Sequence, residues 1–193
     1  KSKPKGQIFL LEPRRLAARA AAARIADERG SRLGEEVGYH VRFDRRAGRD
    51  TRIVAMTDGV FVRRLQDDLF LEGVSIVVFD EFHERDLYTD LALAMVQRVR
   101  AEIRPDLKVV VMSATLDPAP IARYLGDAAV IESAGRHFPV GVRYSRLATR
   151  TPIVEQAEEA VRKVVDETPG DVLVFLPGVG EIRRLERGLA PLS

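Results

Sequence analysis

Short runs of apolar residues alternate along this chain with longer segments in which apolar residues recur at helical spacing. Several runs are continuously apolar, which is typical of strands that are covered on both faces of a sheet. The runs predict strands at 7–11, 52–56, 75–79, 108–112, 129–131, 140–144 and 171–176. The longer segments predict helices at 14–29, 59–67, 87–101, 119–125, 152–167 and 180–189.

The alternation of strands and helices predicts an α/β fold in which helices flank a parallel sheet. The pattern breaks over residues 132–138, where Ser-Ala-Gly-Arg separates two apolar runs. We therefore expect a first domain over residues 1–134 and the beginning of a second over residues 135–193, which holds too few residues for a complete sheet domain.

Composition narrows the class of protein. The chain has no cysteine, which excludes disulfides and thiolate metal sites and predicts a reducing, cytoplasmic setting. It has no apolar run of about 18 residues, so no membrane partner is expected. The net charge is only +2, but residues 1–50 hold 13 basic and 7 acidic residues. Such a basic segment suits a polyanion such as nucleic acid, and it also suits a solvated helix face.

Two adjacent carboxylates, Asp80 and Glu81, follow one of the predicted strands. Ligands of parallel sheets bind beyond the carboxyl ends of the strands. The pair suits hydrolysis of a nucleotide held on Mg²⁺: the first carboxylate holds the ion and the second activates the attacking water. The same residues would also suit an acidic surface loop. His83 would belong to a zinc-protease motif only with histidine at position 87, and Leu87 excludes that motif.

Hydroxyl and basic residues follow three other predicted strands. Ser113 and Thr115 flank an alanine, and they suit either hydrogen bonds to a neighbouring loop or the cap of the next helix. The other two groups each precede a helix: Pro13, Arg14 and Arg15, and Thr57, Asp58 and Gly59. Free N–H groups and forked arginines at a helix start suit phosphate oxygens. Ordinary helix initiation and N-capping explain the same residues.

Taken together, the order of these motifs resembles superfamily 2 helicases of the DEAH/RHA type. The order is Pro-Arg-Arg, Thr-Asp-Gly, Asp-Glu-x-His, Ser-Ala-Thr and Phe-Leu-Pro-Gly, and it covers nearly the whole chain. Residues 11–23, 38–46 and 79–86 resemble the bacterial HrpB type. Phe82 stands where the family name has alanine, but it leaves both carboxylates and the histidine in place.

The resemblance implies a RecA-like, P-loop NTPase fold with a truncated first domain, followed by the start of a second RecA-like domain. It implies an ATP-dependent nucleic-acid helicase that uses ATP and Mg²⁺ and contacts the backbone of RNA or DNA. Asp80 and Glu81 would bind Mg²⁺ and activate water, and His83 would sense the nucleotide. Ser113 and Thr115 would couple hydrolysis to strand separation. The two groups that open helices, from Pro13 to Arg15 and from Thr57 to Gly59, would bind nucleic acid.

The phosphate loop of such enzymes, Gly-x-x-x-x-Gly-Lys-Ser/Thr, is not found in the sequence. The resemblance implies that this loop lies just upstream of residues 4–7. We therefore expect this chain to be a fragment of a longer protein that hydrolyses little ATP by itself, because the loop holds the phosphates. Two other functions stay open: a non-catalytic nucleic-acid-binding module, and a P-loop ATPase with no role on nucleic acid.

Overall fold

The computed structural model describes residues 6–48, 50–114, 117–133, 135, 138–144 and 151–190. The chain divides into two compact units, residues 1–132 and 133–193, each of which is described by itself below. No helix among the described residues is long and apolar enough to cross a membrane.

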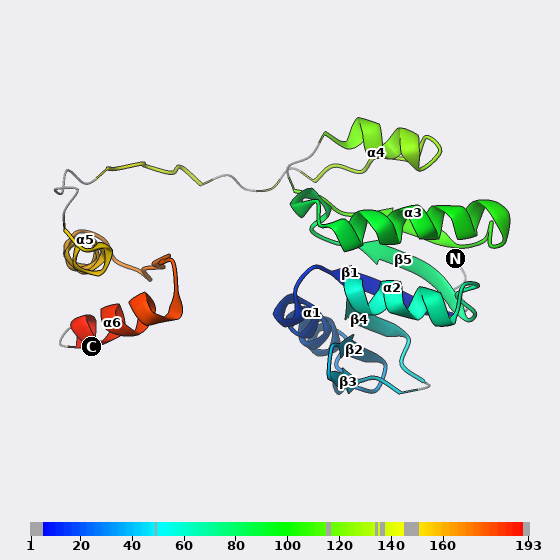
Figure 1. Ribbon diagram of the computed structural model, residues 1–193, viewed down its shortest axis with the longest axis horizontal. Coiled ribbons are helices and arrows are strands. Elements are labelled where there is room, and N and C mark those ends of the chain that lie inside the picture. Colours follow the sequence, from blue (N-terminus) through cyan, green and yellow to red (C-terminus); the bar gives the residue numbers. More distant parts are fainter. Residues whose placement is uncertain are drawn as a thin grey trace. The chain divides into compact units, whose positions relative to one another are not determined.

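The first unit is built on a six-stranded sheet in the order β3-β2-β4-β1-β5-β6 (Figure 1). The strands are β1 (Gln7–Glu12), β2 (Val37–Val41), β3 (Asp44–Arg46), β4 (Ile53–Thr57), β5 (Val74–Phe79) and β6 (Lys108–Val111). Neighbouring strands are parallel, except that β2 and β3 form an antiparallel hairpin. The predicted parallel sheet is therefore confirmed, with a hairpin added at one edge.

Helices cover both faces of this sheet (Figure 1). They are α1 (Arg15–Glu28), α2 (Asp58–Asp67), α3 (Leu87–Glu102) and α4 (Pro118–Tyr124), together with the short 3-10 helix η1 (Phe82–Glu84). Successive residues of β1 point to opposite faces, as the pleat requires: Phe9 and Leu11 pack in the core with α2 and α3, and Leu10 packs in the core with α1. The alanines of α1 at helical spacing are its buried residues, because small side chains let it lie close to the sheet.

The prediction that β6 is covered on both faces is wrong. Val110 is 43% exposed, and the burial of β6 alternates between exposed and partly buried residues. The physical reason is its position: β6 is the last strand of the sheet and pairs with β5 alone among the described residues. Edge strands keep only part of the cover that central strands receive.

The hairpin of β2 and β3 was not expected from the sequence. Its second strand, Asp44–Arg46, is polar and carries no apolar alternation. Its first strand depends on Gly38: a Cβ there would lie 2.2 Å from the carbonyl oxygen of Arg46, so the two strands approach too closely for any side chain at this position.

The second unit consists, in its described part, of two helices, α5 (Ile153–Glu167) and α6 (Val179–Leu189). They pack through the buried residues Val161 and Leu185, and Arg162 donates to the Gly188 carbonyl over 2.9 Å. The predicted strands at 140–144 and 171–176 are not formed, nor is the one at 129–131 of the first unit. A strand requires a partner for its backbone groups, and no described residue pairs with these segments; Phe175, for example, is 85% exposed.

Candidate active site

The carboxyl ends of four neighbouring parallel strands, β4, β1, β5 and β6, meet at one edge of the sheet. The Asp80 N–H donates to the Leu11 carbonyl over 3.0 Å, and the Met112 N–H donates to the Phe79 carbonyl over 2.8 Å. These bonds hold the segment with Asp80 beside the segment that leads to Ser113. The acidic pair and the hydroxyl motif therefore leave adjacent strands at the same edge. Thr115 lies outside the described residues.

The acidic pair forms a sharp turn. Glu81 has φ 48° and ψ 34°, in the left-handed region that non-glycine residues seldom adopt. Its N–H donates to Asp80 Oδ1 over 2.8 Å, and Phe82, the next residue, is buried in the core. The phenyl ring anchors the turn while the Glu81 side chain stays exposed. Phe82 thus acts as a packing residue, and the two carboxylates remain available for chemistry.

His83 connects the acidic pair to the loop after β6. Its Nδ1 accepts from the Ala114 N–H over 3.3 Å, so the ring proton lies on Nε2. Nε2 lies 3.1 Å from Oε2 of Glu81, within donating distance. One imidazole thus touches both the candidate base and the Ser-Ala-Thr segment. The sequence placed these two motifs in one order along the chain, and the structure joins them through this side chain.

Arg14 links the start of α1 to the same loop. Its Nη2 lies 2.9 Å from Oε1 of Glu84, and its side chain is still 74% exposed. Pro13 is partly buried and Arg15 is exposed beside it. The first turn of α1 has neither a side-chain cap nor an acidic residue, so its N–H groups and partial positive charge face outward. Glu84 was not singled out by the sequence, although it lies next to the motif.

The Thr57–Gly59 segment joins β4 to α2, and its residues have different surroundings. Asp58 is buried, and its Oδ2 accepts from Thr89 Oγ1 over 2.7 Å. Its Oδ1 is buried without a partner among the described residues. Burial raises the pKa of Asp58, whereas the bond from Thr89 lowers it. The Asp58 carboxylate therefore fixes the loop from inside, while Gly59 is exposed and Thr57 is partly exposed.

Removal of the Thr89 hydroxyl tests this buried contact. Thr89→Val keeps the shape but leaves both Asp58 oxygens without a donor, so we expect the free energy of unfolding to fall by about 1–3 kcal/mol in urea denaturation. Adding Asp58→Ala to Thr89→Val should cost less than the sum of the two single changes, because no orphaned carboxylate remains. Additive costs would contradict the contact. Thr168→Val removes an exposed hydroxyl and serves as the control.

Glu12, the last residue of β1, is a buried acid that the sequence did not single out as functional. It is 4% exposed and lies beside the acidic pair. Burial raises the pKa of Glu12 to about 7, with further contributions from Asp80, Glu81 and Asp58. Its position after a strand, shared with the other site residues, is the signal that would have found it.

The carboxylates at this edge fit a divalent cation. The pKa of Glu12 is raised mainly by burial and further by the negative charges of Asp80 and Glu81, and a cation near these carboxylates would offset that second contribution. Among the described residues, no three side chains of histidine, cysteine or carboxylate type gather as a metal cage. One or two carboxylates completed by water and phosphate oxygens are the usual surroundings of Mg²⁺. The residues present therefore suit Mg²⁺ better than a zinc ion.

This geometry agrees with the comparisons with known proteins. The family model of the DEAD/DEAH box helicases matches residues 1–123. The chain belongs to the DEAD/DEAH box helicase family. Its relatives include the ATP-dependent RNA helicases HrpB and HrpA of Escherichia coli (strain K12). HrpB is 44% identical over 96% of this chain, and HrpA is 39% identical over 98%.

Solved structures agree with this family membership. A crystal structure of the Escherichia coli DEAH/RHA helicase HrpB superposes with a TM-score of 0.90 at 43% identity, over 98% of this chain and 24% of that one. A crystal structure described as the DExH-box NTPase HrpB of E. coli gives 0.78 at 44% identity, over 97% of this chain and 23% of that one. The predicted RecA-like α/β fold and the likeness to HrpB are therefore confirmed.

This DEAD/DEAH box chain spans only part of its relatives. It corresponds to 23% of the length of HrpB and 15% of the length of HrpA from E. coli. The activity of the whole protein is therefore a separate question from the family of this chain.

Proposed function

We propose that this chain is part of the motor of an ATP-dependent RNA helicase, in which ATP hydrolysis drives unwinding or remodelling of RNA. The observation that carries the proposal is the contact of His83 with both Glu81 and the Ala114 N–H. A helicase motor must connect the hydrolysis site to the elements that move, and this imidazole touches both motifs. The names of the relatives, ATP-dependent RNA helicases, support RNA as the substrate.

In this proposal each residue at the carboxyl edge has a separate role in hydrolysis. Asp80 would hold Mg²⁺, directly or through water, and Glu81 would orient and deprotonate the attacking water. Bound Mg²⁺ neutralises charge on the phosphates of ATP. His83 holds the Glu81 carboxylate in place, and Ser113 and Thr115 form the segment that responds to hydrolysis.

The nucleic acid in this proposal lies along the starts of α1 and α2. Arg14 and Arg15 offer forked donors beside the free N–H groups of α1. Pro13 shapes the entry to that helix, and the Thr57–Gly59 segment offers a hydroxyl and backbone amides. Such contacts go to phosphates and carry little base information. The ion pair of Arg14 with Glu84 supports this part of the proposal, because RNA bound at Arg14 would compete with Glu84 next to the proposed hydrolysis loop.

The domain assignment also belongs to the proposal. Residues 1–134 form the first RecA-like domain without its phosphate loop, and residues 135–193 begin the second. The cytoplasm is the proposed location, because a chain without cysteine suits a reducing compartment.

A nucleic-acid-binding module without catalysis would keep the arginines and the binding but show no turnover in the full-length protein. A P-loop ATPase of another kind would show turnover without RNA binding.

The RNA contact can be tested by the salt dependence of binding. We expect the chain to bind single-stranded RNA in filter-binding assays with an affinity that falls steeply with salt. Arg14→Glu combined with Arg15→Glu should reduce the slope of log affinity against log salt by about 1.4, which corresponds to two lost phosphate contacts. Arg98→Glu, an exposed arginine on α3, is the matched control and should leave the slope unchanged. Equal slopes in all three proteins would remove α1 from the RNA site.

A further inference from the structure

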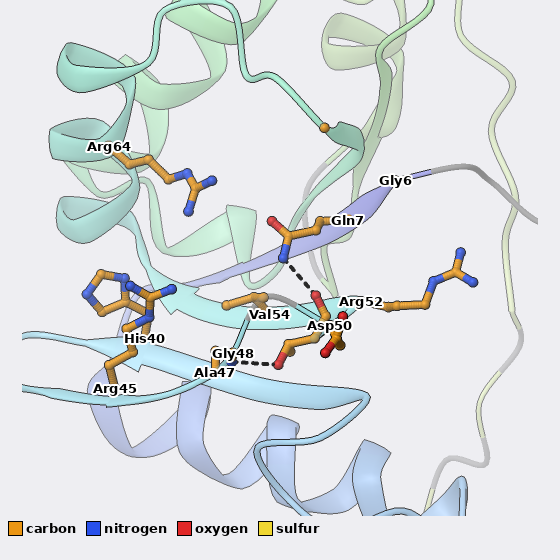
Figure 2. Close-up of a pocket in the computed structure, with 12 residues that line it drawn as sticks. Gly6, Gln7, His40, Arg45, Ala47, Gly48, Asp50, Arg52, Val54 and Arg64 are labelled. Carbon is orange, nitrogen blue, oxygen red and sulfur yellow. Dashed lines mark hydrogen bonds between the residues drawn. The ribbon is translucent and has the colours of Figure 1, made fainter.

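A pocket lies among the β2–β3 hairpin, α2 and the amino ends of β1 and β4 (Figure 2). Its lining includes Gln7 at the start of β1, Arg52 just before β4 and Gly73 just before β5. Its volume is about 570 Å³, within the range of small-molecule sites. Neither the hydrolysis residues nor the proposed RNA contacts line it.

The pocket is basic. Three arginines and one histidine line it, against a single carboxylate, Asp50, among the described lining residues. His40 and Arg45 are register partners across the β2–β3 hairpin, so their side chains lie together at one end of the pocket. Figure 2 shows Arg64 reaching toward them from α2, while Arg52 points away. Three basic groups, one each from β2, β3 and α2, therefore line one space.

Arg64 is the residue whose surroundings most favour a bound anion. Its Nε is buried and has no hydrogen-bond partner among the described residues. Buried donors in folded proteins nearly always have a partner. The guanidinium stacks over the Phe9 ring, 4.7 Å from its centroid, which holds the planar group in one orientation. The chain thus holds the Arg64 guanidinium in one orientation and leaves its Nε without a partner among the described residues.

The pKa values of Arg64 and His40 agree with their partly buried positions in the pocket. Burial lowers the pKa of Arg64; Asp68 raises it, and Arg45 lowers it further. Burial likewise lowers the pKa of His40, with added contributions from Arg45 and Arg64. Both shifts arise mainly from burial, and Arg45 adds a like charge to each group. An anion between them would relieve the repulsion and fill the vacant hydrogen bonds.

We propose that His40, Arg45 and Arg64 form a phosphate-binding site that is separate from the hydrolysis site. A guanidinium fixed by stacking presents forked donors that match phosphate oxygens, and His40 adds a ring N–H. The phosphate belongs either to a small molecule, such as inorganic phosphate or a mononucleotide, or to a nucleic-acid backbone. The site rests on its own geometry and does not depend on the proposed helicase function.

The test is a titration of the 193-residue chain with inorganic phosphate at constant ionic strength, followed by NMR at the Arg64 Nε–H and the His40 ring. We expect saturable shifts at both groups. Arg64→Met keeps the packing on Phe9 but removes the charge, and it should weaken phosphate binding about tenfold or more. Arg45→Gln, an exposed position that leaves the core intact, should weaken it as well. Arg98→Met is the matched control and should bind as the unchanged chain does.

Two further titrations identify the source of the phosphate. Tighter binding of single-stranded RNA than of phosphate at these same groups would assign the site to nucleic acid. Shifts with adenosine monophosphate and phosphate but not with RNA would assign it to small molecules. The proposal is overturned if phosphate, nucleotide and RNA all leave Arg64 and His40 unshifted at millimolar concentrations. It is equally overturned if both Arg64→Met and Arg45→Gln bind phosphate as tightly as the unchanged chain.

Discussion

Replacement of Glu81 by glutamine in the full-length protein is expected to lower RNA-stimulated ATP turnover by about 10²–10⁴-fold. The amide has the shape of the carboxylate and can still accept from Nε2 of His83, 3.1 Å away in the unchanged chain. It cannot take a proton from the attacking water. The turn at Glu81 is set by the backbone and by the buried Phe82 ring, so it should persist.

The measurement for Glu81→Gln compares steady-state ATP hydrolysis with equilibrium ATP binding. We expect ATP binding to remain within a few-fold of the unchanged protein, because the phosphates and Mg²⁺ keep their other ligands. Glu28→Gln makes the same chemical change at an exposed residue that pairs with Arg24, so it controls for loss of a carboxylate. Unchanged turnover in Glu81→Gln would remove this residue from the mechanism. Loss of ATP binding together with turnover would assign it a role in holding the nucleotide.

Replacement of Glu12 by glutamine is expected to stabilise the chain at pH 8 by up to about 3 kcal/mol and to have little effect near pH 4.5. Burial in the folded state raises the pKa of Glu12 from 4.5 to about 7. Between these values the folded chain holds a proton that the unfolded chain has released. The free energy of unfolding of the unchanged chain therefore falls as pH rises through this window, and the loss is complete above about pH 7.

Urea denaturation of both proteins across pH 4.5–8 tests this prediction for Glu12→Gln. The glutamine never becomes charged, so the difference between the two free energies of unfolding should grow from near zero to its full value across the window. Glu28→Gln, an exposed change, should follow the unchanged chain at every pH. Parallel curves for Glu12→Gln and the unchanged chain would show that Glu12 ionises in the folded state at its ordinary pKa.

The sequence predicted the elements that carry a strong local pattern. All six predicted helices are present, because alanine-rich or amphipathic segments and caps such as Asp86 and Asp117 act over only a few residues. Apolar runs located β1, β4, β5 and β6 to within a residue or so. The same signal failed at residues 171–176, because an apolar run becomes a strand only when another strand pairs with it. The apolar pattern also missed the strand Asp44–Arg46, which is polar and forms because it pairs with β2.

The sequence by itself determined the family of this chain. The motifs are short segments in a fixed order, and both their residues and their order can be read directly from the sequence. It also named Asp80 and Ser113 as members of one site, since parallel strands end at a common edge. Only the tertiary structure decided which side chains touch. The contacts Arg14–Glu84, Asp58–Thr89 and His83–Ala114 join residues 31 to 70 positions apart. The raised pKa of Glu12 and the buried Nε of Arg64, which has no partner among the described residues, arise from burial, which depends on the packed sheet and helices and not on neighbours in the chain.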